Sequence, residues 1–167
     1  MTDWANLLTM AEEVIAAARY KNAMIATAES CTGGLIAGLL TEVPGSSAVV
    51  DRGFVTYSNE AKQEMLGVPL ETLQAFGAVS PQTAIAMAEG ALERSHAHIA
   101  ISVTGIAGPG GGTKDKPVGT VHFAIAVKGQ VTTHHPAAFG HETRDQIRYN
   151  AIGKSLKIVL NAIDSVF

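Results

Sequence analysis

This chain of 167 residues has a single cysteine, Cys31, few charged residues (16%) and few aromatic residues (5%). One cysteine cannot form an internal disulfide, which favours a reducing compartment. A net charge of −3 gives no sign of a basic surface for nucleic acid. The first residues are polar and acidic, unlike a signal peptide, and no apolar run reaches the length of a membrane span. We therefore expect a soluble, cytoplasmic protein that binds neither nucleic acid nor membranes.

Several familiar motifs are also missing. The glycine-rich stretch 104–119 lacks the Gly-Lys-Ser/Thr ending of a Walker A loop, and it leads into a strand pattern rather than the helix of a Rossmann motif. There is no Gly-x-Ser-x-Gly elbow and no Ser-x-x-Lys motif. The six histidines show no metal-ligand spacing. The sequence thus predicts neither a metal nor a cofactor.

The composition is otherwise that of an ordinary globular protein, with 47% hydrophobic residues. The length suits one domain, spanning 1–167, with a hydrophobic core of its own. Because charges are few and alanine and glycine are frequent, we expect tight packing with subunit interfaces, and hence a homo-oligomer.

Hydrophobic periodicity and capping residues predict alternating helices and strands. We expect helices over 4–20 (capped by Asp3 or Thr2), from the Ser30 junction to about 41, and over 60–66, 70–75, 81–94 and 141–163. We expect strands over 23–28, 49–57 and 98–104, followed by a hairpin of 118–128 and 130–138. This order implies an α/β fold, a three-layer α/β/α sandwich with a mixed sheet.

The stretch 27–38 is the first candidate for chemistry, because a strand leads there into a helix. Ser30, with Glu29, Cys31 and Thr32, lies at the carboxyl end of that strand, the edge where open α/β sheets bind ligands. The free N–H groups of the following helix could stabilise an oxyanion beside a nucleophilic hydroxyl. The alternative is structural: Ser30 and Thr32 cap the helix, and the glycines only permit close packing.

A serine without a histidine partner needs another base, and a lysine with a lowered pKa can serve. Lys62 is the candidate because it follows the second strand, and it reaches the same sheet edge as Ser30 if the two strands are parallel. Tyr57 and Ser58 could position it or relay the proton. The alternatives are a solvated Lys62 on a short exposed helix and a Ser58–Lys62 pair along one helix face. Cys31 could also act as a nucleophile, although a buried structural role is more frequent.

The stretch 104–119 is the second candidate, for binding. Thr104 ends the central strand at the same edge, and loops this long inside a compact domain are usually functional. Its backbone N–H groups could wrap a phosphate or a ribose. Arg144, near the start of the last helix, could pair with a phosphate, unless it is a plain surface arginine.

Six motifs follow one another over nearly the whole chain, namely 28–34 (AESCTGG), 44–47 (PGSS), 52–62 (RGFVTYSNEAK), 77–80 (GAVS), 102–112 (SVTGIAGPGGG) and 116–120 (KPVGT). Together they resemble the CinA C-terminal domain family, the nicotinamide-nucleotide amidases or NMN deamidases. Two-domain members carry a preceding molybdopterin-binding-like domain, and we assign none of its activity to this chain. The stretch 130–140 matches no fixed pattern of the family.

The resemblance implies hydrolysis of the carboxamide of nicotinamide mononucleotide to nicotinate mononucleotide and ammonia, in pyridine nucleotide recycling. This small-molecule nucleotide is then the expected partner. The resemblance implies Ser30 as the nucleophile and Lys62 as its base, with Tyr57 as a third catalytic residue. The residues expected to bind the substrate are Glu29, Cys31, Thr32, Gly33, Thr104, Gly105, Gly108, Gly110 and Arg144.

Two other classes of function stay open at this point. The chain could be a non-catalytic nucleotide-binding or protein-interaction module, in which the glycine loop grips a ligand and Ser30 only caps a helix. It could also be an amidase for a different amide, such as nicotinamide itself or another nucleotide. An assay for ammonia release from nicotinamide mononucleotide separates the catalytic from the non-catalytic interpretation.

Overall fold

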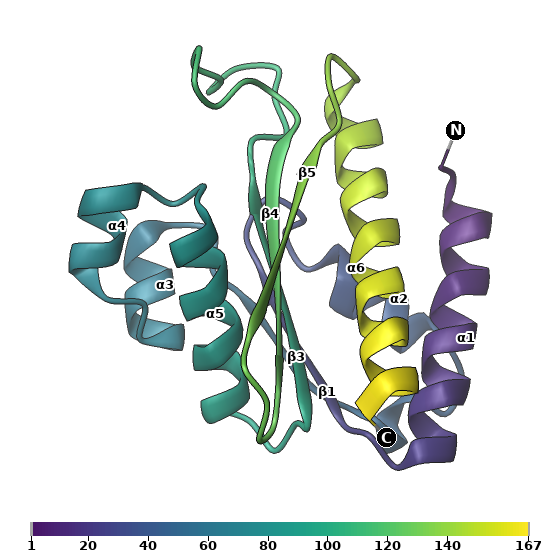
Figure 1. The fold of residues 1–167 in the computed structure, drawn as a ribbon. Coiled ribbons are helices and arrows are strands. Elements are labelled where there is room, and N and C mark those ends of the chain that lie inside the picture. Colours follow the sequence, from purple (N-terminus) through teal and green to yellow (C-terminus); the bar gives the residue numbers. More distant parts are fainter. Residues whose placement is uncertain (1, 167) are drawn as a thin grey trace.

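The structure is a computed structural model, and it describes residues 2–166. Helices cover both faces of a five-stranded sheet, with α3, α4 and α5 on one side and α2 and α6 on the other (Figure 1). Helix α1 packs on α6 and α2. The elements in chain order are α1 (Trp4–Lys21), β1 (Ile25–Glu29), α2 (Leu35–Glu42), the 3-10 helix η1 (Ser46–Ala48), β2 (Val50–Val55), α3 (Asn59–Leu66), α4 (Leu70–Phe76), α5 (Pro81–Glu93), β3 (Ile99–Gly105), β4 (Thr120–Val127), β5 (Thr133–Ala138) and α6 (Arg144–Val166).

The sheet has the strand order β2-β1-β3-β4-β5. Strand β1 runs parallel to both β2 and β3, and Glu29 at its end is paired with Val55 on one side and Val103 on the other. Strands β4 and β5 are antiparallel to their neighbours and form the expected hairpin. The mixed α/β sheet is therefore confirmed. Because β1, β2 and β3 are parallel, their carboxyl ends lie at one edge.

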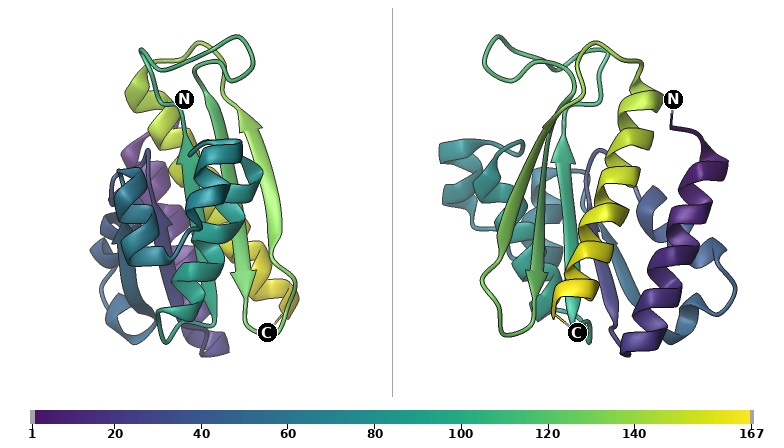
Figure 2. Two further views of the ribbon diagram at one scale, coloured as in Figure 1. Left: turned by 90° about the vertical axis from the view of Figure 1, so that its left-hand side faces the viewer. Right: turned by 45° about the vertical axis from the view of Figure 1, so that its right-hand side comes forward.

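The glycine-rich connection between β3 and β4 emerges at this same edge. Figure 2 shows, from two further sides, that it projects beyond the sheet beside the start of α6. Arg144 joins the two segments, since its Nη1 donates to the Gly108 carbonyl at 2.7 Å. The loop and the first turn of α6 therefore lie together above the carboxyl ends of the parallel strands.

Three of the helices begin where their capping residues predict. The side chains of Asp3, Ser58 and Ser80 accept hydrogen bonds from the backbone N–H groups of the first turns of α1, α3 and α5. Helix α3 ends at Gly67, whose φ of 68° lies in the left-handed region that glycine adopts without strain. Local capping therefore determines where Lys62 lies within α3.

Two helix starts differ from the sequence expectation. Helix α2 begins at Leu35 rather than next to Ser30, because residues 31–34 form turns in which Gly33 and Gly34 have φ values of 60° and 93°. Helix α6 begins at Arg144 rather than at 141. The β5 strand likewise begins later than expected, at Thr133. Sequence patterns place the ends of helices and strands only to within a few residues, because the residues next to each end form local turns.

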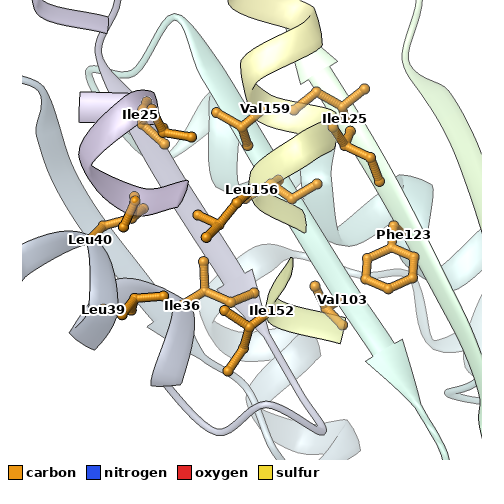
Figure 3. Packing of buried hydrophobic residues seen from close by; sticks show 14 of the residues in the cluster. Ile25, Ile36, Leu39, Leu40, Val103, Phe123, Ile125, Ile152, Leu156 and Val159 are labelled. Carbon is orange, nitrogen blue, oxygen red and sulfur yellow. The ribbon is translucent and has the colours of Figure 1, made fainter. Parts of the chain in front are cut away.

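The larger core lies between the sheet and the helices α1, α2 and α6. Figure 3 shows its centre, where side chains of α2 and α6 meet those of β1, β3 and β4. A smaller core on the opposite face joins α3 and α5 to the sheet through residues such as Leu66 and Met87. Gly53 lets α2 lie close to β2, because a Cβ there would come within 2.8 Å of the Ala37 Cβ. The close approach keeps the start of α2 next to the end of β1.

Candidate active site

A cleft of about 190 Å³ lies at the carboxyl edge of the three parallel strands. It collects one segment from each strand end, together with the connection between α4 and α5 and the first residue of α6. Its lining residues are Ser30, Cys31, Tyr57, Lys62, Ala78, Val79, Thr104, Gly105, Ala107 and Arg144. The expectation that Ser30, Lys62 and Thr104 meet at one sheet edge is confirmed.

Lys62 and Ser30 are in direct contact. Ser30 follows β1 and Lys62 lies in α3 after β2, and Lys62 Nζ donates to Ser30 Oγ at 3.0 Å. The same nitrogen donates to the carbonyl oxygens of Thr56 at 2.7 Å and of Tyr57 at 3.4 Å. Lys62 is only 1% exposed, so the alternative of a solvated lysine is wrong. Ser58 instead caps α3, accepting a hydrogen bond from the Ala61 N–H at 3.0 Å.

Burial changes the acid–base properties of Lys62. It lowers the pKa of the ammonium group from 10.5 to about 8, because a charged amine loses its hydration in the interior, and the nearby Cys31 acts weakly in the opposite direction. A neutral amine has two N–H donors and one lone pair. The carbonyls of Thr56 and Tyr57 can take the two donors, which leaves the lone pair for the hydroxyl proton of Ser30. The arrangement suits a base for Ser30.

Cys31 lies in the same cleft but is a poor nucleophile. Burial raises the pKa of its thiol to about 12, a change that the charges of Arg148 and Lys62 only partly oppose. Since the thiolate is the reactive form, the thiol is inert near neutral pH. These surroundings favour a buried structural role for Cys31 over a role as nucleophile.

Glu29 is fully buried, and its carboxyl group holds the start of α2. It accepts hydrogen bonds from the backbone N–H groups of Gly34 (3.1 Å), Ile36 (3.1 Å) and Ala37 (2.8 Å), and from Thr27 Oγ1 (3.3 Å). Helix α2 has no side-chain cap at its N-cap residue Gly34, so the alternative in which Ser30 and Thr32 cap it is wrong. The expected oxyanion site at the helix start is also occupied, because Glu29 takes those N–H groups.

Replacing Glu29 with alanine is expected to destabilise the protein by about 2–4 kcal/mol, because several buried N–H groups lose their acceptor. Glu29→Gln keeps one acceptor oxygen in place, so we expect a smaller loss of unfolding free energy than for Glu29→Ala. Urea unfolding followed by circular dichroism measures both. The exposed Glu64 on α3 provides the control, since Glu64→Ala is expected to change stability by less than about 0.5 kcal/mol. Equal effects of Glu29→Ala and Glu64→Ala would contradict the capping role.

The remaining cleft residues are tied to one another by hydrogen bonds. Thr104 Oγ1 donates to the Ala78 carbonyl at 2.7 Å and so holds the connection before α5 against the end of β3. Arg144 donates through Nη1 to the Gly108 carbonyl at 2.7 Å and through Nη2 to the Tyr57 hydroxyl at 3.3 Å. Arg144 has no carboxylate within ion-pair distance among residues 2–166. Its positive charge therefore stays available at the rim of the cleft.

Other residues expected to bind substrate lie around the cleft rather than in its lining. Thr32 is fully buried, and its Oγ1 has no hydrogen-bond partner in the described part of the chain. Gly33 lies against Arg148, with 3.5 Å between a Cβ placed there and Arg148 Nη2. Gly108 contributes its carbonyl to Arg144, and Gly110 is exposed with open space around it. Among the expected glycines, Gly105 lines the cleft.

Arg148 is a residue of this site that sequence reasoning missed. Its Nε donates to the Cys31 carbonyl and its Nη2 to the Thr32 carbonyl, both at 3.2 Å. No motif around Arg148 indicates this role, because it lies 116 residues along the chain from Thr32. The spacing of four residues between Arg144 and Arg148 could have indicated this role, because residues four apart share a face of a helix.

Residues 2–166 contain neither a candidate metal site nor a membrane-spanning helix. No three or more His, Cys, Asp or Glu side chains gather there in a way that could hold a metal ion. None of the helices in this range is long and apolar enough to cross a lipid bilayer. The expected homo-oligomer stays a prediction from composition.

Comparison with known proteins identifies the family to which the chain belongs. The sequence matches the family model described as the CinA C-terminal domain over residues 7–163. The nicotinamide-nucleotide amidohydrolase PncC of Escherichia coli K12 is 48% identical over 158 residues, which are 94% of each chain. The crystal structure of the competence/damage inducible protein CihA from Agrobacterium tumefaciens superposes with a TM-score of 0.92 at 53% identity, covering 95% of this chain and 96% of that one.

Other relatives are longer proteins. The CinA-like protein of Akkermansia muciniphila is 63% identical over 107 residues, which are 64% of this chain and 26% of that protein. The chain spans about a third or less of the length of several curated relatives that it matches. The family model nonetheless covers almost all of this sequence, and the Escherichia coli relative matches it nearly end to end. The chain belongs to the CinA C-terminal domain family.

Proposed function

We propose that this chain hydrolyses the carboxamide of nicotinamide mononucleotide to nicotinate mononucleotide and ammonia, and that it serves cytoplasmic recycling of pyridine nucleotides. The observation that carries the proposal is the buried 3.0 Å contact between Lys62 Nζ and Ser30 Oγ at the floor of a cleft. The name of the Escherichia coli relative supplies the substrate class. A serine paired with a buried lysine is the chemistry expected of an amidase without a histidine base.

In the first step, Ser30 Oγ attacks the carboxamide carbon, and its proton passes to the neutral amine of Lys62. The lone pair of that amine faces Ser30 when its two N–H groups bond the carbonyls of Thr56 and Tyr57. The attack converts the amide oxygen into an oxyanion. The amine thus becomes an ammonium group while negative charge develops a few ångströms away.

The oxyanion needs backbone donors, and the N–H of Cys31 is the candidate. It belongs to the residue that follows the nucleophile, a position that supplies an oxyanion donor in other serine hydrolases. Cys31 lines the cleft beside Ser30. The first N–H groups of α2 do not serve, because Glu29 holds them. One such donor lowers the barrier by about 3 kcal/mol in comparable enzymes.

The second half of the reaction reverses the proton movement. The Lys62 ammonium delivers its proton to the amide nitrogen as the carbon–nitrogen bond breaks, and ammonia leaves. Water then attacks the acyl carbon, Lys62 takes a proton from that water, and the Ser30 oxygen recovers its proton as the ester bond breaks. The overall reaction is balanced, because one amide and one water molecule give one carboxylic acid and one ammonia.

The cleft is smaller than a pocket for a whole nucleotide. Its 190 Å³ compares with about 300–1,000 Å³ for typical ligand sites, so it encloses the carboxamide and part of the ring. Tyr57, which is 62% exposed at the rim, can stack on the pyridine ring. The ribose phosphate then extends over the glycine-rich loop towards Arg144, whose charge has no carboxylate partner in the described chain.

A panel of three amides tests the substrate. Nicotinamide mononucleotide is expected to be hydrolysed at least about 10²-fold more efficiently, as kcat/KM, than nicotinamide riboside or nicotinamide, because only the nucleotide offers a phosphate to Arg144. Ammonia release coupled to a dehydrogenase measures all three. Equal efficiency towards free nicotinamide would contradict the nucleotide assignment, and no release from any of them would favour a binding module.

The reaction is expected to speed up with pH as Lys62 loses its proton. With a pKa of about 8, the neutral base is the minor form below that pH, so kcat/KM rises about tenfold per pH unit there and levels off above it. A pH–rate profile between pH 6 and about 10 measures the midpoint. An activity that stays flat from pH 6 to 9 would remove Lys62 as the base.

A further inference from the structure

We propose that Arg148 is a positioning residue, whose guanidinium clamps the turn after Ser30 so that the Cys31 N–H stays directed at the oxyanion. The inference rests on the proposed function, because it takes Ser30 as the nucleophile. Arg148 does not line the cleft, and it acts through the backbone of residues 31 and 32. Its contribution is therefore to the geometry of the acylation step.

The clamp consists of two hydrogen bonds from one planar group. Arg148 Nε donates to the Cys31 carbonyl and Nη2 to the Thr32 carbonyl, both at 3.2 Å. The Ser30 carbonyl accepts a third bond, from the Gly33 N–H at 3.0 Å. Three successive carbonyl groups of the turn are thus each held by a donor. A guanidinium holds such a pair more firmly than an ammonium, because its N–H groups lie in a rigid plane.

Holding these carbonyls also sets the direction of the N–H groups. Each peptide unit is planar and trans, so its N–H points away from its carbonyl oxygen. The Ser30 carbonyl shares its peptide with the Cys31 N–H, and the Cys31 carbonyl shares its peptide with the next N–H. The Gly33 N–H binds the Ser30 carbonyl and so fixes the Cys31 N–H on the opposite side of that peptide. Arg148 acts on this arrangement through the Thr32 carbonyl, which shares its peptide with the Gly33 N–H.

Helix α2, which begins at Leu35, holds only part of the turn. The Leu35 N–H donates to the Thr32 carbonyl at 3.2 Å, whereas the Cys31 carbonyl is bound by Arg148. Gly33 and Gly34 both have positive φ and few steric restraints of their own. A turn of this kind has several accessible shapes, and an external contact selects one of them.

The clamp is anchored on a rigid element. Arg148 follows the buried Ile147 on α6, and the buried Ala151 lies on the next turn of the helix. Arg144, four residues before Arg148, binds the Gly108 carbonyl and the Tyr57 hydroxyl. One face of α6 therefore contacts three parts of the site: the turn after Ser30, the Tyr57 hydroxyl and the glycine-rich loop.

The charge of Arg148 also acts at the turn. Although burial dominates and raises the pKa of the Cys31 thiol, the charge of Arg148 acts in the opposite direction and favours negative charge there. Among residues 2–166, Arg148 has no carboxylate within ion-pair distance that would neutralise it. Its guanidinium is thus both a clamp and a source of positive potential behind the oxyanion site.

Steady-state kinetics on Arg148→Met and Arg148→Lys test the inference. We expect Arg148→Met to lower kcat for nicotinamide mononucleotide by about 10- to 100-fold, with KM changed less than about threefold and the midpoint of the pH–rate profile unchanged. Arg148→Lys is expected to fall in between, because it keeps the charge but loses the fork. The matched control is Lys154→Met on the same helix, which loses a 3.0 Å bond to the Pro136 carbonyl away from the cleft and is expected to keep wild-type kcat.

A second readout does not depend on the natural substrate. A fluorophosphonate probe that labels Ser30, identified by mass spectrometry, also develops an oxyanion, so its rate of labelling is expected to drop about tenfold in Arg148→Met. Thermal unfolding shows whether each variant is folded. If Arg148→Met does not fold, the kcat and the labelling rate of Arg148→Lys test the role of Arg148 instead. Wild-type kcat and labelling rate in the folded variant would overturn the role of Arg148 and leave the proposed function standing. If the wild-type protein reacts with the probe at Ser30 but does not hydrolyse nicotinamide mononucleotide, only the proposed substrate is wrong. If it neither reacts with the probe nor hydrolyses nicotinamide mononucleotide, both the proposed function and the role of Arg148 are wrong.

Discussion

Replacing Ser30 with alanine is expected to reduce ammonia release from nicotinamide mononucleotide by at least about 10⁴-fold. The variant has no atom that can form the acyl-enzyme, and removing a serine nucleophile costs this much or more in other serine hydrolases. The coupled ammonia assay on purified protein measures the loss. The fold is expected to stay intact, because the substitution removes one hydrogen-bond acceptor of Lys62 and leaves its bond to the Thr56 carbonyl in place.

The control for Ser30→Ala is a second buried serine. Ser155 on α6 is fully buried, and its Oγ donates to the Ala151 carbonyl at 2.8 Å, away from the cleft. Ser155→Ala removes the same atom from the interior and is expected to keep wild-type turnover. If Ser30→Ala turned over like the wild type, Ser30 would not be the nucleophile. If Ser155→Ala were equally inactive, the loss in Ser30→Ala would reflect the removal of a buried hydroxyl and would not support Ser30 as the nucleophile.

Replacing Lys62 with methionine is expected to lower kcat by about 10³- to 10⁴-fold, because Ser30 loses its base while the methionine fills a similar volume. The residual rate is expected to lose the rise with pH that has its midpoint near 8 in the wild type. The pH–rate profiles of both proteins between pH 6 and 10 are the measurement. A Lys62→Met variant that kept the wild-type profile would assign the base to another group.

The same substitution is expected to stabilise the fold at neutral pH. The pKa of Lys62 is about 8 in the folded state, against the ordinary value of 10.5. Below pH 8 Lys62 is therefore charged in both the folded and the unfolded protein, but its charge is buried only in the folded one. Unfolding relieves that penalty, which amounts to about 3 kcal/mol at about 1.4 kcal/mol per pKa unit. Between pH 8 and 10.5 the unfolded state binds more protons, so wild-type stability rises with pH and the advantage of Lys62→Met shrinks.

Urea unfolding of wild type and Lys62→Met at pH 7 and at about pH 10 separates these effects. The difference in unfolding free energy is expected to favour the variant at pH 7 and to decrease towards pH 10. The lost hydrogen bonds of Lys62 are common to both pH values, so the change with pH reports the charge alone. A difference that does not depend on pH would mean that Lys62 is not desolvated in the folded protein.

Much of the local structure was predictable because it depends on neighbours in the chain. The caps at Asp3, Ser58 and Ser80 are made by side chains three residues from their partners, and the three helices that they cap, α1, α3 and α5, begin where the sequence indicates. Short apolar runs identified the strands at 23–28 and 98–104, and alternation of polar and apolar residues identified the strand at 49–57 and the hairpin. The pairing of Ser30 with Lys62 followed from a single further assumption, that the first two strands are parallel, and the structure confirms it.

The order of the elements, and the sheet edge at which Ser30, Lys62 and Thr104 meet, could therefore be predicted from the amino-acid sequence. The roles of Glu29 and Arg148 depend on tertiary packing. Both residues bond backbone groups whose positions depend on how α2 and α6 pack on the sheet, and for Arg148 these groups are more than a hundred residues away in the chain. The inert thiol of Cys31 and the lowered pKa of Lys62 are likewise consequences of burial, which no local pattern records. Short-range hydrogen bonding is encoded within a few residues, whereas desolvation and backbone clamping exist only once distant segments have packed together.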